Sequence, residues 1–276
     1  MSKTEDTWDV IVIGGGPAGM MSAGTAAARG LRVLLLEKNP TLGKKLRITG
    51  GGRCNITNAT FDDRTLLAKY GEAEQFLFSA FSKHSVKDTL NFFNQLGLST
   101  KIEAENRVFP TSEKAEDVAK AMEQYIIKNK VVVKTGILVK SIETDKDQVT
   151  CLKTSAGDFY AESYILATGG TSRPETGSTG DGYTWLKNIG HHVIFPKPSL
   201  VPVLVAETWV KDLAGLSLED TNIALYEDDS LISKHLGKVL FTHNGLSGPG
   251  VLNLSTIIGD ALPHGKVTIK INTSPT

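Results

Sequence analysis

The chain has 276 residues, of which 40% are hydrophobic and 22% charged, and its 30 basic and 30 acidic side chains balance to a formal net charge of zero. Such a chain can bury a large core in one large domain or two. Zero net charge argues against nucleic acid or an anionic membrane as a generic electrostatic partner. Two distant cysteines provide neither a disulfide framework nor a Cys-x-x-Cys pair, which favours a reducing cytoplasm. We expect no signal peptide and no membrane span.

Residues 8–37 have the pattern of a strand–helix–strand unit that holds a dinucleotide. A short apolar strand at 10–13 runs directly into Gly-Gly-Gly-Pro-Ala-Gly. An alanine-rich helix is predicted over 20–29, and a second apolar strand at 33–36 ends on Glu37. A glycine motif alone is also typical of an ordinary turn. Here strand, glycines, helix, second strand and acid stand in the required order, which favours the dinucleotide.

The glycines, the proline and the acid of this unit each have a specific role in binding a dinucleotide. Gly14 allows the tight turn, Gly16 lets the backbone approach a pyrophosphate, and Gly19 has no side chain to separate helix from strand. Pro17 begins the helix at a position where a missing N–H costs nothing. The N-terminus of the helix would face the phosphates, and Glu37 would accept hydrogen bonds from ribose hydroxyls.

The middle of the chain mixes helices and strands. We expect a loop over 39–60, a hairpin carrying Arg107–Pro110 and a buried strand at 131–133. Apolar periodicity predicts helices around 76–81, 86–96 and 114–129. Three short strands of a meander are expected at 139–143, 149–154 and 159–164.

A second landmark is the apolar strand beginning at Tyr164, which runs into Thr-Gly-Gly. We interpret it as a strand that returns to the first sheet and passes the nucleotide; an ordinary buried strand with a glycine turn is the alternative. A Gly-Ser-Thr-Gly-Asp-Gly segment (177–182) then leads into a helix at 183–189, whose N-terminus would be able to face an anion.

From about residue 191 the chain becomes β-rich. Short strands separated by Pro, Gly and charged turns are expected at 193–195, 201–205, 222–226, 239–242 and 267–271, and a helix at 251–258. We therefore divide the chain into a domain at 1–190 and a second, β-rich part at 191–276.

The loop from Lys38 to Arg53 has five basic residues and no acid. Charge runs of this kind are usually solvated surface loops. Three consecutive glycines (50–52) make that interpretation less favourable, because they cost backbone entropy unless a close approach or a positive φ is required.

The run Gly-Lys-Lys-Leu-Arg-Ile-Thr-Gly-Gly-Gly-Arg-Cys-Asn-Ile-Thr-Asn (43–58) resembles the signature of the BaiN/YhiN-type bacterial flavoproteins, usually described as NAD(P)/FAD-dependent oxidoreductases or aminoacetone-oxidase-like proteins. Further matches lie at 107–114, 167–182, 202–203 and 240–249, so the resemblance covers nearly the whole chain.

The resemblance implies an α/β fold in which a Rossmann-like FAD-binding domain, of the two-dinucleotide-binding-domain flavoprotein type, carries an inserted β-rich domain. It implies FAD in extended form, with the pyrophosphate held by Gly14, Gly16, Pro17 and Ala18 beside Gly19, and the adenosine ribose held by Glu37. The stretch from phosphate to flavin would be lined by Lys38, Lys45, Gly52, Arg53, Cys54 and Asn55. The adenine would contact the backbone of Val139, and the nucleotide would be covered by Thr168, Gly169 and Gly170.

One departure from the family is evident. Family members are longer and return to the FAD domain near their C-terminus, whereas nothing in these 276 residues resembles that closing segment. We therefore expect a truncated member, with the part at 191–276 forming the first portion of the inserted domain.

Other candidate residues have competing interpretations. His243 or Ser247 would be able to face a substrate, although a capped turn with a hydrogen-bonded histidine is the stronger interpretation. Arg107 and Arg173 are candidates for binding a substrate carboxylate, with structural ion pairs equally plausible. For Cys54 a packing role in a tight loop is favoured over redox chemistry. We expect no metal site, because the adjacent histidines 191 and 192 point to opposite faces of an extended segment.

These features predict an FAD-dependent oxidoreductase that transfers hydride through the flavin, with an unknown substrate and NAD(P)H as a candidate donor. The main alternative is a non-catalytic flavin- or dinucleotide-binding module. An NAD-dependent dehydrogenase is disfavoured by the cationic loop and the later Ala-Thr-Gly-Gly. An FAD-dependent RNA-modifying enzyme is suggested only by analogy of fold, and the zero net charge weakens this hypothesis. No catalytic residue and no oligomeric state are predicted.

Overall fold

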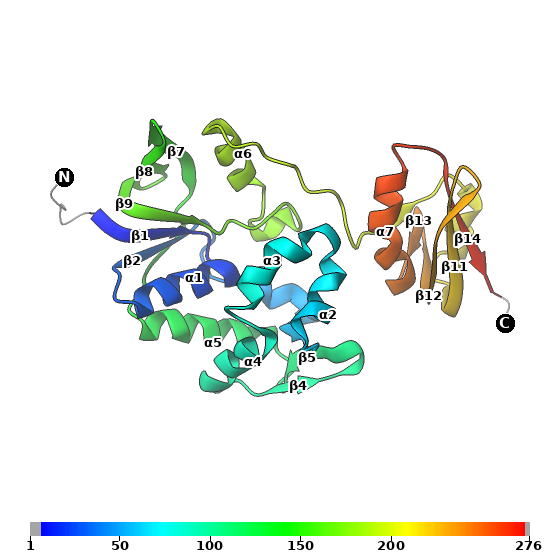
Figure 1. The fold of residues 1–276 in the computed structure, drawn as a ribbon, viewed down its shortest axis with the longest axis horizontal. Coiled ribbons are helices and arrows are strands. Elements are labelled where there is room, and N and C mark those ends of the chain that lie inside the picture. Colours follow the sequence, from blue (N-terminus) through cyan, green and yellow to red (C-terminus); the bar gives the residue numbers. More distant parts are fainter. Residues whose placement is uncertain (1–6, 274–276) are drawn as a thin grey trace. The chain divides into compact units, whose positions relative to one another are not determined.

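The structure is a computed structural model that describes residues 7–273. It divides the chain into two compact units, the first extending to Ile194 and the second beginning at Phe195 (Figure 1). Unit 1 holds a largely parallel sheet with helices, and unit 2 holds an antiparallel sheet with one helix. The predicted fold class, a Rossmann-like α/β domain accompanied by a β-rich second domain, is confirmed.

The main sheet of unit 1 has the strand order β6-β2-β1-β9-β8-β7. Its strands are β1 (Thr7–Ile13), β2 (Val33–Glu37), β6 (Val132–Thr135), β7 (Val139–Asp145), β8 (Gln148–Thr154) and β9 (Gly157–Leu166). The first four in the order pair in parallel, with Val12 of β1 opposite Leu35 of β2. The helix α1 (Pro17–Ala28) agrees with the alanine-rich helix expected at 20–29, and α5 (Ala115–Lys128) agrees with the helix expected at 114–129 from apolar periodicity.

Strand β9 is a single strand where the sequence pattern predicts two, at 159–164 and from Tyr164 onward. Its beginning pairs antiparallel with β8, with Phe159 opposite Leu152, and the rest pairs parallel with β1, with Ile165 opposite Val12. The alternation of side chains continues unchanged when a strand changes partner, so the sequence contains no mark of the change. The predicted return of this segment to the first sheet is confirmed.

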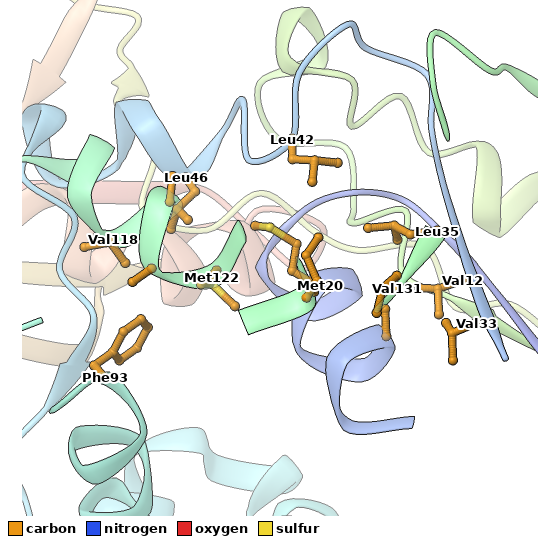
Figure 2. Close-up of a cluster of buried hydrophobic side chains, with 14 of the residues drawn as sticks. Val12, Met20, Val33, Leu35, Leu42, Leu46, Phe93, Val118, Met122 and Val131 are labelled. Atoms are coloured by element: carbon orange, nitrogen blue, oxygen red, sulfur yellow. The ribbon is translucent and has the colours of Figure 1, made fainter. Parts of the chain in front are cut away.

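The central strands are buried on both faces, which is why they read as continuous apolar runs. Val12 and Leu35 face a cluster that includes Met20 of α1 and Met122 of α5 (Figure 2). Their neighbours in sequence, such as Ile11, belong to a second cluster on the opposite face, together with side chains of β7, β8 and α6 (Asp181–Asn188). The helices α1 and α5 thus cover one face of the parallel strands (Figure 1).

Strand β6 corrects one expectation. The sequence predicts a buried strand at 131–133, but β6 lies at the edge of the sheet and pairs only with β2 among the described strands. Val131 is buried, whereas Val132 is 41% exposed. Three valines in a row do not distinguish an edge strand from a central one, because strand order is a property of the whole sheet.

Between β2 and α5 the chain forms a smaller sheet and several short helical segments. The sheet has the order β3-β5-β4, with β3 at Thr57–Asn58, β4 at Thr100–Ile102 and β5 at Arg107–Pro110. The helices are α2 (Asp63–Leu67), α3 (Glu74–Phe81) and α4 (Val86–Gln95), and 3₁₀ turns at Leu46–Gly52 interrupt the loop expected over 39–60. A reciprocal capping box between Ser85 and Asp88 begins α4.

Unit 2 is a five-stranded antiparallel sheet packed against α7 (Pro249–Ala261). In sheet order the strands are β10 (Val203–Leu204), β13 (Gly245–Ser247), β12 (Ser230–Thr242), β11 (Ser217–Glu227) and β14 (Val267–Asn272). Pro249 occupies the start of α7, as expected. The strand expected at 193–195 is wrong, because the chain has no regular structure there and Ile194 is 82% exposed.

Candidate functional site

A cavity of about 500 Å³ opens at the carboxyl ends of the parallel strands β1, β2 and β9. This edge is where open α/β sheets bind ligands. The cavity is lined by the segments 13–18, 36–39, 43–45, 137–139, 166–169 and 176–178, together with Asp181 and Trp185 of α6. Residues separated by more than a hundred positions in sequence therefore surround one space.

Two glycines allow the backbone segments beside the cavity to pack closely against each other. A Cβ at Gly14 would lie 2.4 Å from the carbonyl oxygen of Ala167, and one at Gly19 would lie 1.8 Å from that of Gly14. Gly14 also has a φ of +107°, which disfavours other residues. The roles expected of these two positions, a tight turn and close packing of helix against strand, agree with this geometry.

Gly16 differs from both of them. Its φ of −76° is a conformation that any residue adopts, and a Cβ there would meet no atom within 4 Å. Neither the backbone nor the neighbouring atoms of the chain require a glycine at this position. Pro17 begins α1 immediately afterwards, so the first N–H groups of a 12-residue helix face the open side of the cavity. This open cradle fits a diphosphate group.

Glu37, at the end of β2, is held rigidly although it lines the cavity. Its Oε2 accepts from the backbone N–H of Gly15 at 2.6 Å, and its Oε1 accepts from both the backbone and the side-chain amide of Asn39 at 2.7 Å. The residue is only 8% exposed. A buried carboxylate with these partners is fixed in orientation and keeps acceptor capacity for hydroxyl groups.

Three lysines connect the segment after β2 to the loop that precedes α6. Lys38 Nζ lies 2.7 Å from Asp181 Oδ2 and donates to Thr179, while Lys45 donates to Ser178 Oγ at 2.6 Å. Lys44, the third, donates to the carbonyl oxygen of Glu175. These contacts hold the loop at the rim of the cavity.

Burial lowers the pKa of the Lys45 ammonium, and the nearby carboxylate of Glu175 only partly offsets this. For Asp181, burial alone would raise the pKa, but the hydrogen bonds from Lys38 and Thr179 outweigh it and leave the pKa below its ordinary value. Lys45 thus has a hydroxyl group as its hydrogen-bond partner and would gain from an anionic ligand.

The second part of the glycine-rich loop lies elsewhere. Arg53 forms ion pairs with Glu103 at 2.5 Å and Glu113 at 3.2 Å and stacks on Phe109 at 4.1 Å. Within residues 7–273, the lining of the cavity includes none of the predicted residues Gly52, Arg53, Cys54 and Asn55.

Cys54 and Asn55 have structural partners in this loop. Cys54 is buried with a φ of +61°, and burial raises the pKa of its thiol although a hydrogen bond with Thr49 opposes this. The amide of Asn55, in the orientation that satisfies its neighbours, donates to the carbonyl oxygens of Thr57 and Val108.

At the other end of the predicted list, Val139, Thr168 and Gly169 line the cavity, whereas Gly170 is not part of the described lining, and a Cβ there would lie 3.4 Å from the hydroxyl oxygen of Tyr183. Ten of the predicted positions thus share the lining: Gly14, Gly16, Pro17, Ala18, Glu37, Lys38, Lys45, Val139, Thr168 and Gly169. Gly19 contributes through packing.

Sequence reasoning missed several lining residues, chiefly Asn39, Lys44, Ser178, Asp181 and Trp185. The only signal for the last three was the Gly-Ser-Thr-Gly-Asp-Gly segment and the helix after it, which pointed to an anion at the helix N-terminus. In the structure Asp181 is the first residue of α6, and the cation Lys38 is its partner.

The remaining candidates lie apart from this site. Arg107 pairs with Glu105 at 3.6 Å and Arg173 with Glu175 at 3.5 Å, and the cavity lining, as far as the structure describes it, contains neither arginine. His243 is exposed in the turn between β12 and β13 of unit 2. No group of three His, Cys, Asp or Glu residues in the described ranges is arranged to hold a metal ion. None of the helices described is long and apolar enough to cross a membrane.

The parallel sheet, the glycine turn into α1, the acid at the end of β2 and the returning strand β9 together define a Rossmann-type FAD-binding domain. Within that class, the chain belongs to the HI0933-like family, because the family model described as "HI0933-like protein Rossmann domain" matches residues 8–267.

Among curated proteins, the chain is 31% identical over 258 residues to the "3-dehydro-bile acid delta(4,6)-reductase" of Clostridium scindens, covering 92% of this chain and 61% of that protein. It is 29% identical over 274 residues to the "Ribosomal RNA dihydrouridine synthase" of Haemophilus influenzae, covering 95% of this chain and 66% of that protein. The chain thus spans somewhat under two thirds of the length of these relatives.

Among solved structures, the 3-ketosteroid-delta4-(5alpha)-dehydrogenase of Rhodococcus jostii RHA1 matches with a TM-score of 0.55 and 16% sequence identity. The match covers 79% of this chain and 61% of that one. At this level of identity the similarity establishes the fold alone.

Proposed function

We propose that the cavity of unit 1 binds FAD, and that the chain belongs to an oxidoreductase that transfers hydride through the flavin. The observation that carries the proposal is the open space at Gly16, at the start of α1. The lack of a side chain at Gly16 serves neither the backbone conformation nor any neighbour, and it leaves open a cradle at the N-terminus of α1. A pyrophosphate needs such an approach of the backbone.

The other residues of the cavity have complementary tasks in this proposal. The N–H groups at the start of α1 and the ammonium of Lys45 would neutralise the diphosphate, and Glu37 would bind the ribose hydroxyls. Thr168 and Gly169 would cover the nucleotide from the end of β9. When bound, FAD supplies the hydride chemistry, and the chain supplies position and electrostatics.

For the substrate we propose a small molecule, with NAD(P)H as the electron donor and the cytoplasm as the location. The name of the Clostridium scindens relative, a reductase, supports a reductive reaction on a small molecule. The zero formal net charge also favours a small substrate over a polyanion. We propose no nucleic-acid and no membrane partner.

A second candidate function is the reduction of a base in RNA. Two relatives, from Haemophilus influenzae and Escherichia coli, have the name "Ribosomal RNA dihydrouridine synthase" and are each 29% identical to this chain. Formation of dihydrouridine in ribosomal RNA by the purified protein, with no reaction on unsaturated small molecules, would favour this candidate.

The test is an absorbance spectrum of the purified protein, followed by anaerobic titration with NADH and with NADPH. We expect a flavin spectrum that loses its visible absorbance when the donor is added. In the variant Gly16→Val the added side chain fills the cradle, so FAD affinity falls at least ~10-fold while circular dichroism is unchanged. Gly259→Val is the matched control, because a Cβ at Gly259 also meets nothing within 4 Å but lies in α7 of unit 2.

The outcomes separate the alternatives. FAD that binds but is not reduced by either donor or by any substrate supports the non-catalytic flavin-binding module. Tight binding of NAD without affinity for FAD would revive the NAD-dependent dehydrogenase. Equal FAD affinity in the two glycine variants would overturn the assignment of the site to this cavity.

A further inference from the structure

Trp185 of α6 forms part of the cavity wall. It is 8% exposed, lines the cavity, and donates its indole N–H to the carbonyl oxygen of Lys140 at 3.2 Å. Asp181, four residues earlier on α6, lines the same cavity, so one face of the helix is directed to it. A Cβ at Gly182 would lie 2.4 Å from Thr168 Oγ1, and this glycine therefore lets α6 approach the end of β9 closely.

A chain of contacts leads from Glu37 to Trp185. The backbone carbonyl of Glu37 accepts from the N–H of Ile137 at 3.0 Å, and the segment 137–139 continues along the cavity wall. The next residue is Lys140, whose carbonyl oxygen holds the indole. The side chain of Glu37 is bound to the glycine turn, because the backbone N–H of Gly15 donates to its carboxylate. Trp185 therefore belongs to the part of the cavity that follows Glu37 along the segment 137–140.

The wall in this part of the cavity is apolar. Ile137, Val139 and Trp185 belong to one hydrophobic cluster, and Leu138 lines the cavity between the first two. An apolar wall that contains a fixed aromatic ring suits a flat heterocyclic base, since contact of a base with an aromatic side chain contributes about 1–3 kcal/mol. The phosphate end, in contrast, consists of backbone N–H groups and lysines.

We propose that Trp185 is the residue that contacts the adenine of the bound dinucleotide and gives the site its preference for an adenine nucleotide. The proposal rests on the proposed function, because it takes the ribose to lie at Glu37 and the base to extend from it onto this wall. The hydrogen bond to Lys140 holds the ring in place before the ligand arrives, so little side-chain entropy is lost on binding.

The first test follows the emission of Trp185 itself. The chain has three tryptophans, so the double variant Trp8→Phe with Trp209→Phe leaves only Trp185. ADP is the probe, because it carries the adenosine diphosphate half of FAD and no flavin that would absorb tryptophan emission. We expect a saturable change of emission on addition of ADP. The matched control is Trp8→Phe with Trp185→Phe, which retains Trp209 of unit 2 and should show no change.

The second test measures affinity and base preference. In Trp185→Leu we expect ADP to bind about tenfold more weakly, with Trp185→Phe in between. The preference for ADP over UDP should fall in Trp185→Leu, because a purine covers more of the wall than a pyrimidine does. A general loosening of the fold would weaken both nucleotides alike. Trp209→Leu is the control substitution, at a tryptophan that is 55% exposed.

The proposal is overturned if Trp185→Leu leaves the ADP affinity and the base preference unchanged, or if the emission of Trp185 does not change when ADP binds. In either case, FAD binding by the chain would leave the proposed function intact. Absence of both FAD and ADP binding in the unsubstituted chain overturns the two together. If circular dichroism shows that Trp185→Leu does not fold, the emission of Trp185 and the Trp185→Phe variant decide the question.

Discussion

The backbone N–H of Gly15 donates to Oε2 of Glu37 at 2.6 Å. The acid that ends β2 is thus hydrogen-bonded to the glycine turn that follows β1, in addition to the parallel pairing of the two strands. A Cβ at Gly15 would lie 3.0 Å from this same carboxylate oxygen and 2.4 Å from a methyl carbon of Leu42. The position of the carboxylate and the shape of the turn therefore depend on each other.

The first prediction concerns Glu37→Gln. Both carboxylate oxygens accept from N–H donors, one from Gly15 and the other from Asn39, and a glutamine must turn its NH₂ group toward one of these donors. We expect the free energy of unfolding to fall by about 1–3 kcal/mol, measured by urea denaturation. Glu72→Gln, at an exposed acid of unit 1, should be neutral. Equal stability of the two variants would contradict the prediction.

The second prediction compares two glycines of the same turn. Gly19→Ala places a Cβ 1.8 Å from the carbonyl oxygen of Gly14, so the backbone must shift, and we expect a loss of about 1–3 kcal/mol or more. Gly16→Ala adds its methyl group to open space and should cost under about 1 kcal/mol. Thermal unfolding measures both. The reverse order of stability would show that the turn is shaped differently.

The third prediction concerns pH and the pair formed by Lys38 and Asp181. The pKa of Asp181 lies below its ordinary value of 3.8, so the pair contributes its full stability above that value and loses it as the pH falls through the folded-state pKa. Because Asp181 is 34% exposed, solvent screens the pair, and we expect Asp181→Asn to cost less than about 1 kcal/mol at pH 7.

Urea denaturation of the unsubstituted chain and of Asp181→Asn at pH 7 and pH 3 measures this contribution. The difference between the two proteins should shrink at pH 3. Asp260→Asn is the control, since Asp260 pairs with Lys197 at 2.6 Å on the surface of unit 2 with 56% exposure, and its effect should be smaller. A difference that grows on acidification would refute the prediction.

The fourth prediction concerns the cysteine thiols. Cys54 and Cys151 are both buried, and burial raises the pKa of each thiol. Because the thiolate is the reactive form, we expect slow labelling of both by a chromogenic disulfide reagent at pH 8 in the folded chain, and rapid labelling in guanidinium chloride. Rapid labelling of one thiol in the native protein would instead indicate an accessible, reactive cysteine.

Much of unit 1 was predictable because the signals are local. The order of strand, glycine turn, helix and acid within residues 8–37 depends on neighbours only a few positions apart, and the helix at 115–128 follows from its apolar period. The edge position of β6 and the change of partner along β9 were not predictable. Both are decided by which strands lie beside them, and the side-chain pattern of a strand is the same in either case.

For the site, the sequence by itself determined the residue types that can hold a diphosphate and a ribose: the glycines at 14, 16 and 19, Pro17 at the start of a helix, and Glu37 at the end of a strand. These residues all belong to one short strand–helix–strand unit, so their arrangement depends on neighbours that are close in sequence. The partners of the charged side chains were decided only by the tertiary structure. Lys38 pairs with Asp181, 143 residues further along the chain, whereas Arg53 pairs with Glu103 and Glu113, which are not part of the described cavity lining. A cation can pair with any acid that the fold brings within reach, and for Lys38 the packing of α6 beside the end of β9 places Asp181 there.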